Sequence, residues 1–162
     1  MSDFDNNTLF RKGMAFIASE EWDLAREAFE KLVKEEPDEI YWHLYLGISY
    51  MNTGEIEKAK RSFRTATIVD PENEGGHFFL AHVLLNRNND PDILNMDPII
   101  EAVEHLLKAT KLNPQLAQAH YKLGVAYACL GIGGEALKSF QTALDLEPDG
   151  HGLRRPASRD LR

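Results

Sequence analysis

The chain has 162 residues, of which 43% are hydrophobic and 27% are charged, a composition typical of one globular domain. Its formal net charge of −8 argues against nucleic-acid binding, which needs a basic face to neutralise phosphates. Its single cysteine, Cys129, excludes an internal disulfide framework and fits a reducing compartment.

The start of the chain is acidic and polar, whereas a secretory signal would begin with basic residues followed by an apolar run. Every apolar run is far shorter than the roughly 20 residues that a membrane span requires. We therefore predict a cytoplasmic protein that does not insert into membranes.

The sequence repeats at a fixed period. Four prolines are separated by 34, 43 and 34 residues, namely Pro37, Pro71, Pro114 and Pro148. Four alanines keep the same intervals, namely Ala25, Ala59, Ala102 and Ala136. The longer interval is one period plus nine residues, so we expect four units, the third with a nine-residue insertion.

In chain order, we predict an N-terminal extension over 1–5, then repeats over 6–39, 40–73, 74–116 and 117–150. Each repeat should contain two helices, with Gly54 or Gly131 in the turn between them, because glycine accepts a positive φ. Each proline should end the second helix. Gly47 and Gly124 indicate close approach of the paired helix, and we expect Ala59 and Ala136 to stand opposite them.

The second and fourth repeats carry the clearest pattern. The second reads His43, Leu46-Gly47, Tyr50, Ala59, Phe63, Ala66 and Pro71; the fourth reads His120, Leu123-Gly124, Tyr127, Ala136, Phe140, Ala143 and Pro148. This pattern resembles the tetratricopeptide repeat. The resemblance implies an all-α fold, a right-handed α-solenoid of four helix-turn-helix repeats, and a protein-binding function without cofactors.

The insertion in the third repeat, residues 86–96, is rich in asparagine and aspartate. Asn88, Asp90 and Asp92 alternate as in a calcium loop, but the turn glycine and the closing glutamate are missing. We therefore favour a plain polar loop, followed by a helix that starts at Asp97-Pro98.

The first helices of such repeats line the concave face of the stack. On this face we predict a mainly apolar groove for an amphipathic helix or extended peptide of a partner protein. The groove residues are Phe10, Met14, Ile17, Tyr41, Leu44, Ile48, Met51, Phe78, His82 and Tyr121. The alternative is that these side chains are covered within the chain or by a second copy.

We find no motif for catalysis or metal binding. His43, His77 and His120 share one repeat position, too far apart for one metal ion, so we expect them to serve as packing residues. Cys129 has no activating neighbour in the sequence, and we expect it to be a small packing residue as well.

The fourth repeat lacks an evident cap. Residues 151–162 contain four arginines, one aspartate, Pro156 and no helical stripe, so we expect a basic, disordered tail. The last repeat would then be buried in a homodimer, or the chain would be a piece of a longer array.

The leading functional hypothesis is a non-enzymatic interaction scaffold with an apolar groove. Size, acidity and groove character also resemble the cytoplasmic chaperones that hold hydrophobic translocator proteins before secretion. A third possibility is a structural module that self-assembles through the uncapped repeat.

Overall fold

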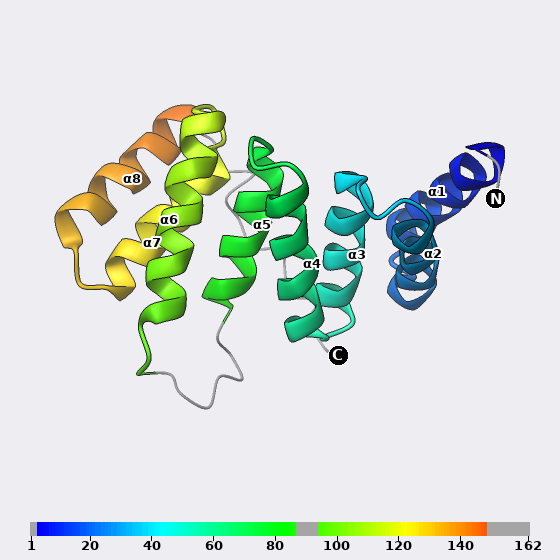
Figure 1. The fold of residues 1–162 in the computed structure, drawn as a ribbon. Helices are drawn as coiled ribbons and strands as arrows, with labels where there is room; N and C mark the ends of the chain where they lie inside the picture. Colours follow the sequence, from blue (N-terminus) through cyan, green and yellow to red (C-terminus); the bar gives the residue numbers. More distant parts are fainter. Residues whose placement is uncertain (1–2, 87–93, 149–162) are drawn as a thin grey trace, which may run out of the picture. The chain divides into compact units, whose positions relative to one another are not determined.

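The computed structural model describes residues 3–86 and 94–148 (Figure 1), and within these ranges it contains α-helices and no strand. The predicted all-α class is confirmed. The bounds of the helices are α1 Asp3–Ala18, α2 Trp22–Glu35, α3 Ile40–Asn52, α4 Ile56–Val69, α5 Glu74–Leu85, α6 Asp97–Leu112, α7 Ala117–Cys129 and α8 Gly133–Leu146.

Three segments for which the sequence made a prediction lie partly or wholly outside the described residues. The predicted extension over 1–5 is partly helical, because α1 already begins at Asp3. Most of the insertion, including Asn88, Asp90 and Asp92, lies outside the described residues, and so does the basic tail.

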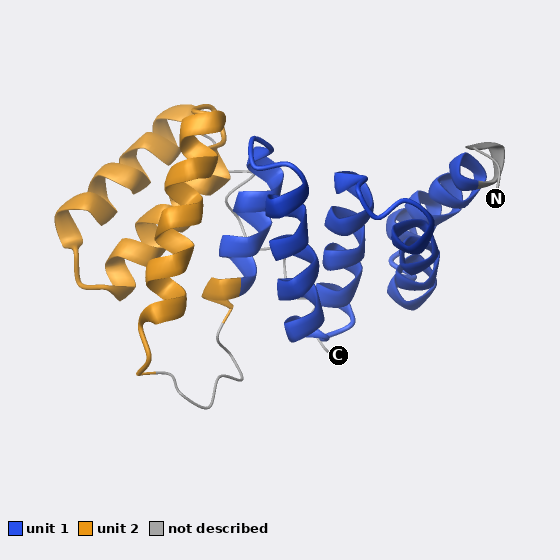
Figure 2. Cartoon of the chain, in the orientation of Figure 1, with its two compact units in different colours: residues 1–83 blue, residues 84–162 orange. Residues whose placement is uncertain are grey.

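The chain divides into two compact units, residues 1–83 and 84–162 (Figure 2). In the first unit, α2 packs between α1 and α3, and α3 packs against α4. The stacked rings of Phe63 and Phe79, 5.4 Å apart between centroids, join α4 to α5. In the second unit, α7 packs between α6 and α8. Consecutive helices are therefore neighbours in space within each unit, as in a helical repeat.

The repeated alanines are the small residues at the centre of each pair. Ala25, Ala59 and Ala102 are completely buried, and Ala136 is 4% exposed. One turn later, large side chains fill the space between the helices, and three of them are also completely buried: Phe29, Phe63 and Leu106. The periodic pattern thus identifies the core because i and i+4 share a helix face.

Two glycines make room for phenyl rings of the paired helix. A Cβ atom added at Gly47 would lie 2.5 Å from Cε1 of Phe63, and one at Gly124 would lie 2.7 Å from Cδ1 of Phe140. The atoms nearest to each added Cβ belong to these rings, which lie one turn beyond Ala59 and Ala136 on the paired helix, so the closest approach at each glycine is to a phenyl ring.

The turns within the pairs differ in one respect. Gly54 and Gly131 have positive φ angles of 81° and 74°, as the sequence predicted. The first repeat has Glu20 at the same position, with φ of 57°. A side chain in this left-handed conformation is strained by roughly 1–2 kcal/mol.

The three equivalent histidines fix the turn between helix pairs. Their Nε2 atoms donate to backbone carbonyls six residues earlier: His43 to Pro37 at 2.6 Å, His77 to Pro71 at 2.9 Å and His120 to Pro114 at 3.0 Å. Each bond satisfies a carbonyl that its proline-containing turn leaves without a helical donor. The histidines therefore do more than the packing that the sequence predicted.

Candidate protein-binding face

The predicted groove residues lie on the first helices of the repeats. Within the first unit they occupy α1, α3 and α5, whereas Tyr121 lies on α7 of the second unit. Their exposure differs widely. Tyr41 is 53% exposed, Leu44 and Phe78 are each 7% exposed, and the others in the first unit are half-buried.

Four of these residues share a single repeat position: Phe10, Leu44, Phe78 and Tyr121. In the first unit this position faces the next repeat. The Phe10 ring centroid lies 5.1 Å from that of Trp42 and 6.0 Å from that of Tyr45. Cδ1 of Leu44 lies 3.8 Å from where a Cβ of Gly75 would be, so Leu44 contacts α5.

Phe10 and Leu44 are therefore covered within the chain, which was the alternative to an open groove. Phe78 is equally buried. The physical reason is that a turn of about 100° per residue places this position toward the following helix. A helical stripe in the sequence does not distinguish that side from the open side.

The remaining groove residues of α1 and α3 form what we call the α1–α3 face, namely Met14, Ile17, Tyr41, Ile48 and Met51. Met14 and Ile17 pack with one side against the core cluster around Phe29 and stay partly exposed. The whole of α3 contains no aspartate, glutamate, lysine or arginine. The α1–α3 face is thus apolar, with the Tyr41 hydroxyl as a polar group.

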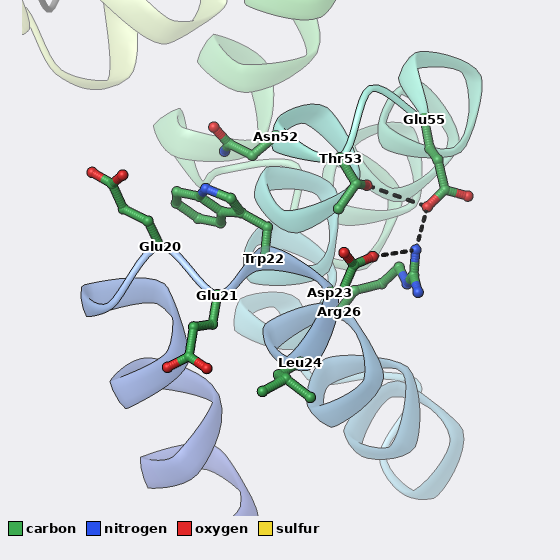
Figure 3. Close-up of a pocket in the computed structure, with 9 residues that line it drawn as sticks. All are labelled: Glu20, Glu21, Trp22, Asp23, Leu24, Arg26, Asn52, Thr53 and Glu55. Carbon is green, nitrogen blue, oxygen red and sulfur yellow. Dashed lines mark hydrogen bonds and ion pairs between the residues drawn. The ribbon is translucent and has the colours of Figure 1, made fainter. Parts of the chain in front are cut away.

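An acidic hollow of about 560 Å³ lies elsewhere in the first unit, between the α1–α2 turn and the α3–α4 turn (Figure 3). In Figure 3 the Trp22 indole lies between the side chains of Glu20 and Asn52. The complete lining is Glu20, Glu21, Trp22, Asp23, Leu24, Arg26, Asn52, Thr53 and Glu55.

One wall of this hollow is an ion-pair network. Arg26 Nη1 lies 3.1 Å from Asp23 and 2.7 Å from Glu55, which joins α2 to the start of α4. Hydrogen bonds from Lys58 and then Arg26 lower the pKa of Glu55 to about 2. No motif in the sequence predicted this hollow, although Glu20 stands where the second and fourth repeats have Gly54 and Gly131, which was a visible signal.

The structure indicates no functional site at the other residues that the sequence raised as candidates. Cys129 is exposed at the end of α7, so the prediction that it is a small packing residue is wrong. Within residues 3–86 and 94–148, no three side chains of histidine, cysteine, aspartate or glutamate are grouped as a metal site. No helix in that part of the chain combines the length and apolarity needed to cross a membrane.

Family comparisons agree with the helix pairing. Models described as tetratricopeptide repeat match residues 10–59 and 117–149, and a model described as TPR repeat matches residues 100–131. The chain is a tetratricopeptide repeat protein. No curated protein sequence matches it significantly.

Solved tetratricopeptide structures have the same fold. TTC0263 from Thermus thermophilus is 26% identical with a TM-score of 0.75, over 88% of this chain and 75% of its own. MamA from Desulfovibrio magneticus is 17% identical with a TM-score of 0.74, over 92% and 79%. YrrB is 22% identical with a TM-score of 0.74, over 91% and 71%.

This tetratricopeptide repeat protein therefore has the architecture of a protein-interaction scaffold. The solved structures in this comparison are similar to it in fold, and YrrB is described as having an unusual peptide-binding site. The predicted family and the predicted solenoid of paired helices are confirmed, whereas the nine-residue insertion in the third repeat stays a prediction.

Proposed function

We propose that the protein is a cytoplasmic, non-enzymatic scaffold that binds an apolar peptide or helix of a partner protein on the α1–α3 face. The observation that carries this proposal is the absence of charged side chains from α3, combined with the 53% exposure of Tyr41. A peptide-binding site in a protein of similar fold, YrrB, supports the same class of function.

The chemistry of the face selects the ligand. Half-buried Ile48, Met51, Met14 and Ile17 gain further burial when an apolar side chain covers them, at about 25 cal/mol per Å² of apolar area. Methionine adapts its shape to different ligands. The Tyr41 hydroxyl can pair with a backbone group of an extended peptide or with a polar residue of a helix. His82 on α5 carries the same repeat position as Ile48 and extends this set.

The test is peptide selection followed by titration. A random dodecapeptide library is selected on the whole chain, and fluorescence anisotropy measures the affinity of enriched peptides. We expect enriched peptides to carry two or three large apolar residues. In the variant with Tyr41, Ile48 and Met51 all changed to Ser, the affinity for these peptides should fall at least tenfold, because the peptides lose apolar contacts.

The matched control is Ile68→Ser. Ile68 is 74% exposed on α4, so this change also removes an exposed apolar side chain but leaves α3 intact. Circular dichroism must show unchanged helicity in both variants. Equal binding by the triple variant and the wild type would exclude the α1–α3 face, and selection of mainly charged peptides would exclude an apolar ligand.

The chaperone alternative would use the same face for a longer client. It predicts that affinity rises with the length of an apolar segment and that the protein suppresses aggregation of that segment. If the protein is instead a scaffold for one defined motif, the affinity should stop rising once the peptide contains the whole motif.

A further inference from the structure

Two side chains of the first repeat contact the second repeat directly, and a third packs in a cluster that both repeats share. The Phe10 ring lies against Trp42 and Tyr45, and Arg26 bonds Glu55 at 2.7 Å. Val33 packs against the core cluster that includes Leu46 of α3. We call Phe10, Arg26 and Val33 the docking side of the first repeat, and include Val33 because Thr67, at its position in the second repeat, contacts α5.

The second repeat uses the same side. Thr67 stands at the repeat position of Val33, and its Cγ2 lies 3.5 Å from where a Cβ of Gly76 would be, so it contacts α5. Two of these positions, those of Phe10 and Val33, are therefore occupied in the second repeat by side chains that contact the third, namely Leu44 and Thr67.

The fourth repeat has Tyr121, Leu137 and Leu144 at these positions, each 111 residues after its counterpart in the first repeat. The geometry within the two repeats is equivalent. The rings of Phe10 and Phe29 are 6.5 Å apart, and the corresponding rings of Tyr121 and Phe140 are 5.6 Å apart.

These three side chains, which we call the terminal face, are open. Leu137 is 72% exposed, Leu144 is 49% exposed and Tyr121 is 36% exposed. Leu137 and Leu144 are two turns apart and lie on one side of α8, because seven residues nearly complete two turns. In the first unit, side chains at the equivalent positions pack against the next repeat. In the fourth repeat these positions are apolar and exposed.

The opposite side of the first repeat is polar. The positions of Trp42 and Tyr45 on α3, which meet Phe10, correspond on α1 to Thr8 and Arg11, both exposed. If the first repeat of one copy docked onto the fourth repeat of another, Leu137 and Leu144 would lie near the guanidinium group of Arg11. A contact between two terminal faces pairs leucine with leucine.

The charges near the terminal face permit such a contact. Glu135 and Lys138 form an ion pair at 2.9 Å, and Gln141 donates to Asp145 at 2.8 Å. Both signs are present and each side chain already has a partner, so two copies do not meet as like-charged surfaces. Residues 151–162, with four arginines and two leucines, offer a less apolar cover than the face itself.

We propose that the terminal face binds the terminal face of a second copy of this chain in a twofold-symmetric dimer. This surface is distinct from the α1–α3 face, so the proposal does not depend on the proposed function. An isologous contact closes on itself and produces no longer array. With α8 only about 20 Å long, the interface falls below the roughly 800 Å² per partner of stable complexes, so the dimer should dissociate on dilution.

The test is sedimentation velocity of the whole chain over about three orders of magnitude in concentration, up to several hundred micromolar, consistent with a weak interface. We expect a reversible monomer–dimer equilibrium that persists under reducing conditions and in Cys129→Ser, which excludes a disulfide through that exposed thiol. The variant with Leu137→Glu and Leu144→Glu should stay monomeric at every concentration.

The matched control is Ile68→Glu, which places a carboxylate at a 74% exposed apolar site on α4 and should leave dimerisation unchanged. Since Leu137 and Leu144 are exposed, the double variant should keep its helicity by circular dichroism. A wild type that remains monomeric throughout overturns the proposal, as does a dimer that the leucine changes leave intact.

Two further outcomes point to other occupants and also overturn the proposal. Trimers and larger species would indicate head-to-tail stacking. A monomeric wild type whose melting temperature drops by several degrees in the leucine variant would indicate that another segment of the same chain covers the face.

Discussion

At the scale of single residues, the helices of a pair fit together where a glycine faces a phenyl ring. The space that Gly47 leaves is filled by Phe63, whose side chain is completely buried. A completely buried ring cannot move aside cheaply, because protein interiors are close-packed. The low helix propensity of this glycine is therefore offset by the packing it allows.

Replacing Gly47 with Ala should lower the free energy of unfolding by about 1–2 kcal/mol. Overpacking costs about 1–3 kcal/mol, and the gain in helix propensity returns up to about 1 kcal/mol. Urea denaturation followed by circular dichroism measures the difference. The control is Gly134→Ala on α8, where nothing lies within 4 Å of the added Cβ, and this change should stabilise. The same sign for both variants would contradict the packing explanation.

The strained turn at Glu20 leads to a second prediction. Glu20→Gly should raise the free energy of unfolding by about 1 kcal/mol, because glycine adopts the observed φ of 57° without steric cost. The expected rise in melting temperature is about 2–4 °C. Glu21→Gly removes the same charge at the next residue, where φ is −86°, and should not stabilise. Stabilisation by both changes would point to charge rather than to backbone strain.

At the scale of elements, carboxylates hold the first two helix pairs together. Glu55, before α4, pairs with Arg26 of α2 and with Lys58. Glu36, after α2, accepts hydrogen bonds from Trp42 Nε1 at 3.0 Å and Asn6 Nδ2 at 2.9 Å. The bond from Trp42, followed by that from Asn6, lowers the pKa of Glu36. Each carboxylate must be ionised to accept all of its bonds.

Stability should therefore fall in acid. Because the pKa of Glu55 is about 2 in the folded protein and 4.5 without these partners, its contribution is present above pH 4.5 and is lost as pH falls toward 2. Urea midpoints measured between pH 2 and 6 should show a shallower decline for Glu55→Gln than for the wild type. Arg26→Met should give an intermediate slope, since Lys58 remains. Identical slopes in all three proteins would show that this network does not control acid stability.

At the scale of the whole molecule, side chains at one repeat position differ in burial from repeat to repeat. Phe10 and Leu44 are covered by a following repeat, whereas the equivalent Tyr121 is 36% exposed. Equivalent positions of the repeat thus differ in exposure from one repeat to another. This dependence distinguishes the two proposed surfaces: the α1–α3 face for a partner protein and the terminal face for a second copy.

Part of the candidate site was predictable for the same reason. The side chains of the α1–α3 face remain candidates because each stays at least partly exposed. The acidic hollow was not predicted, because its lining comes from two turns that are about thirty residues apart in the chain. Cys129 was misplaced because a small apolar residue near a helix end carries no periodic signal for burial.

The sequence by itself determined the repeat, the helix pairs and the core positions. A period of 34 residues with buried alanines and aromatics constrains local structure, and i, i+3 and i+4 spacing defines the buried side of each helix. Only the tertiary structure decided which apolar residues are covered by the next repeat, that phenyl rings fill the glycine gaps, and that histidines hold the prolyl carbonyls. These features depend on distances between helices, which a one-dimensional pattern does not contain.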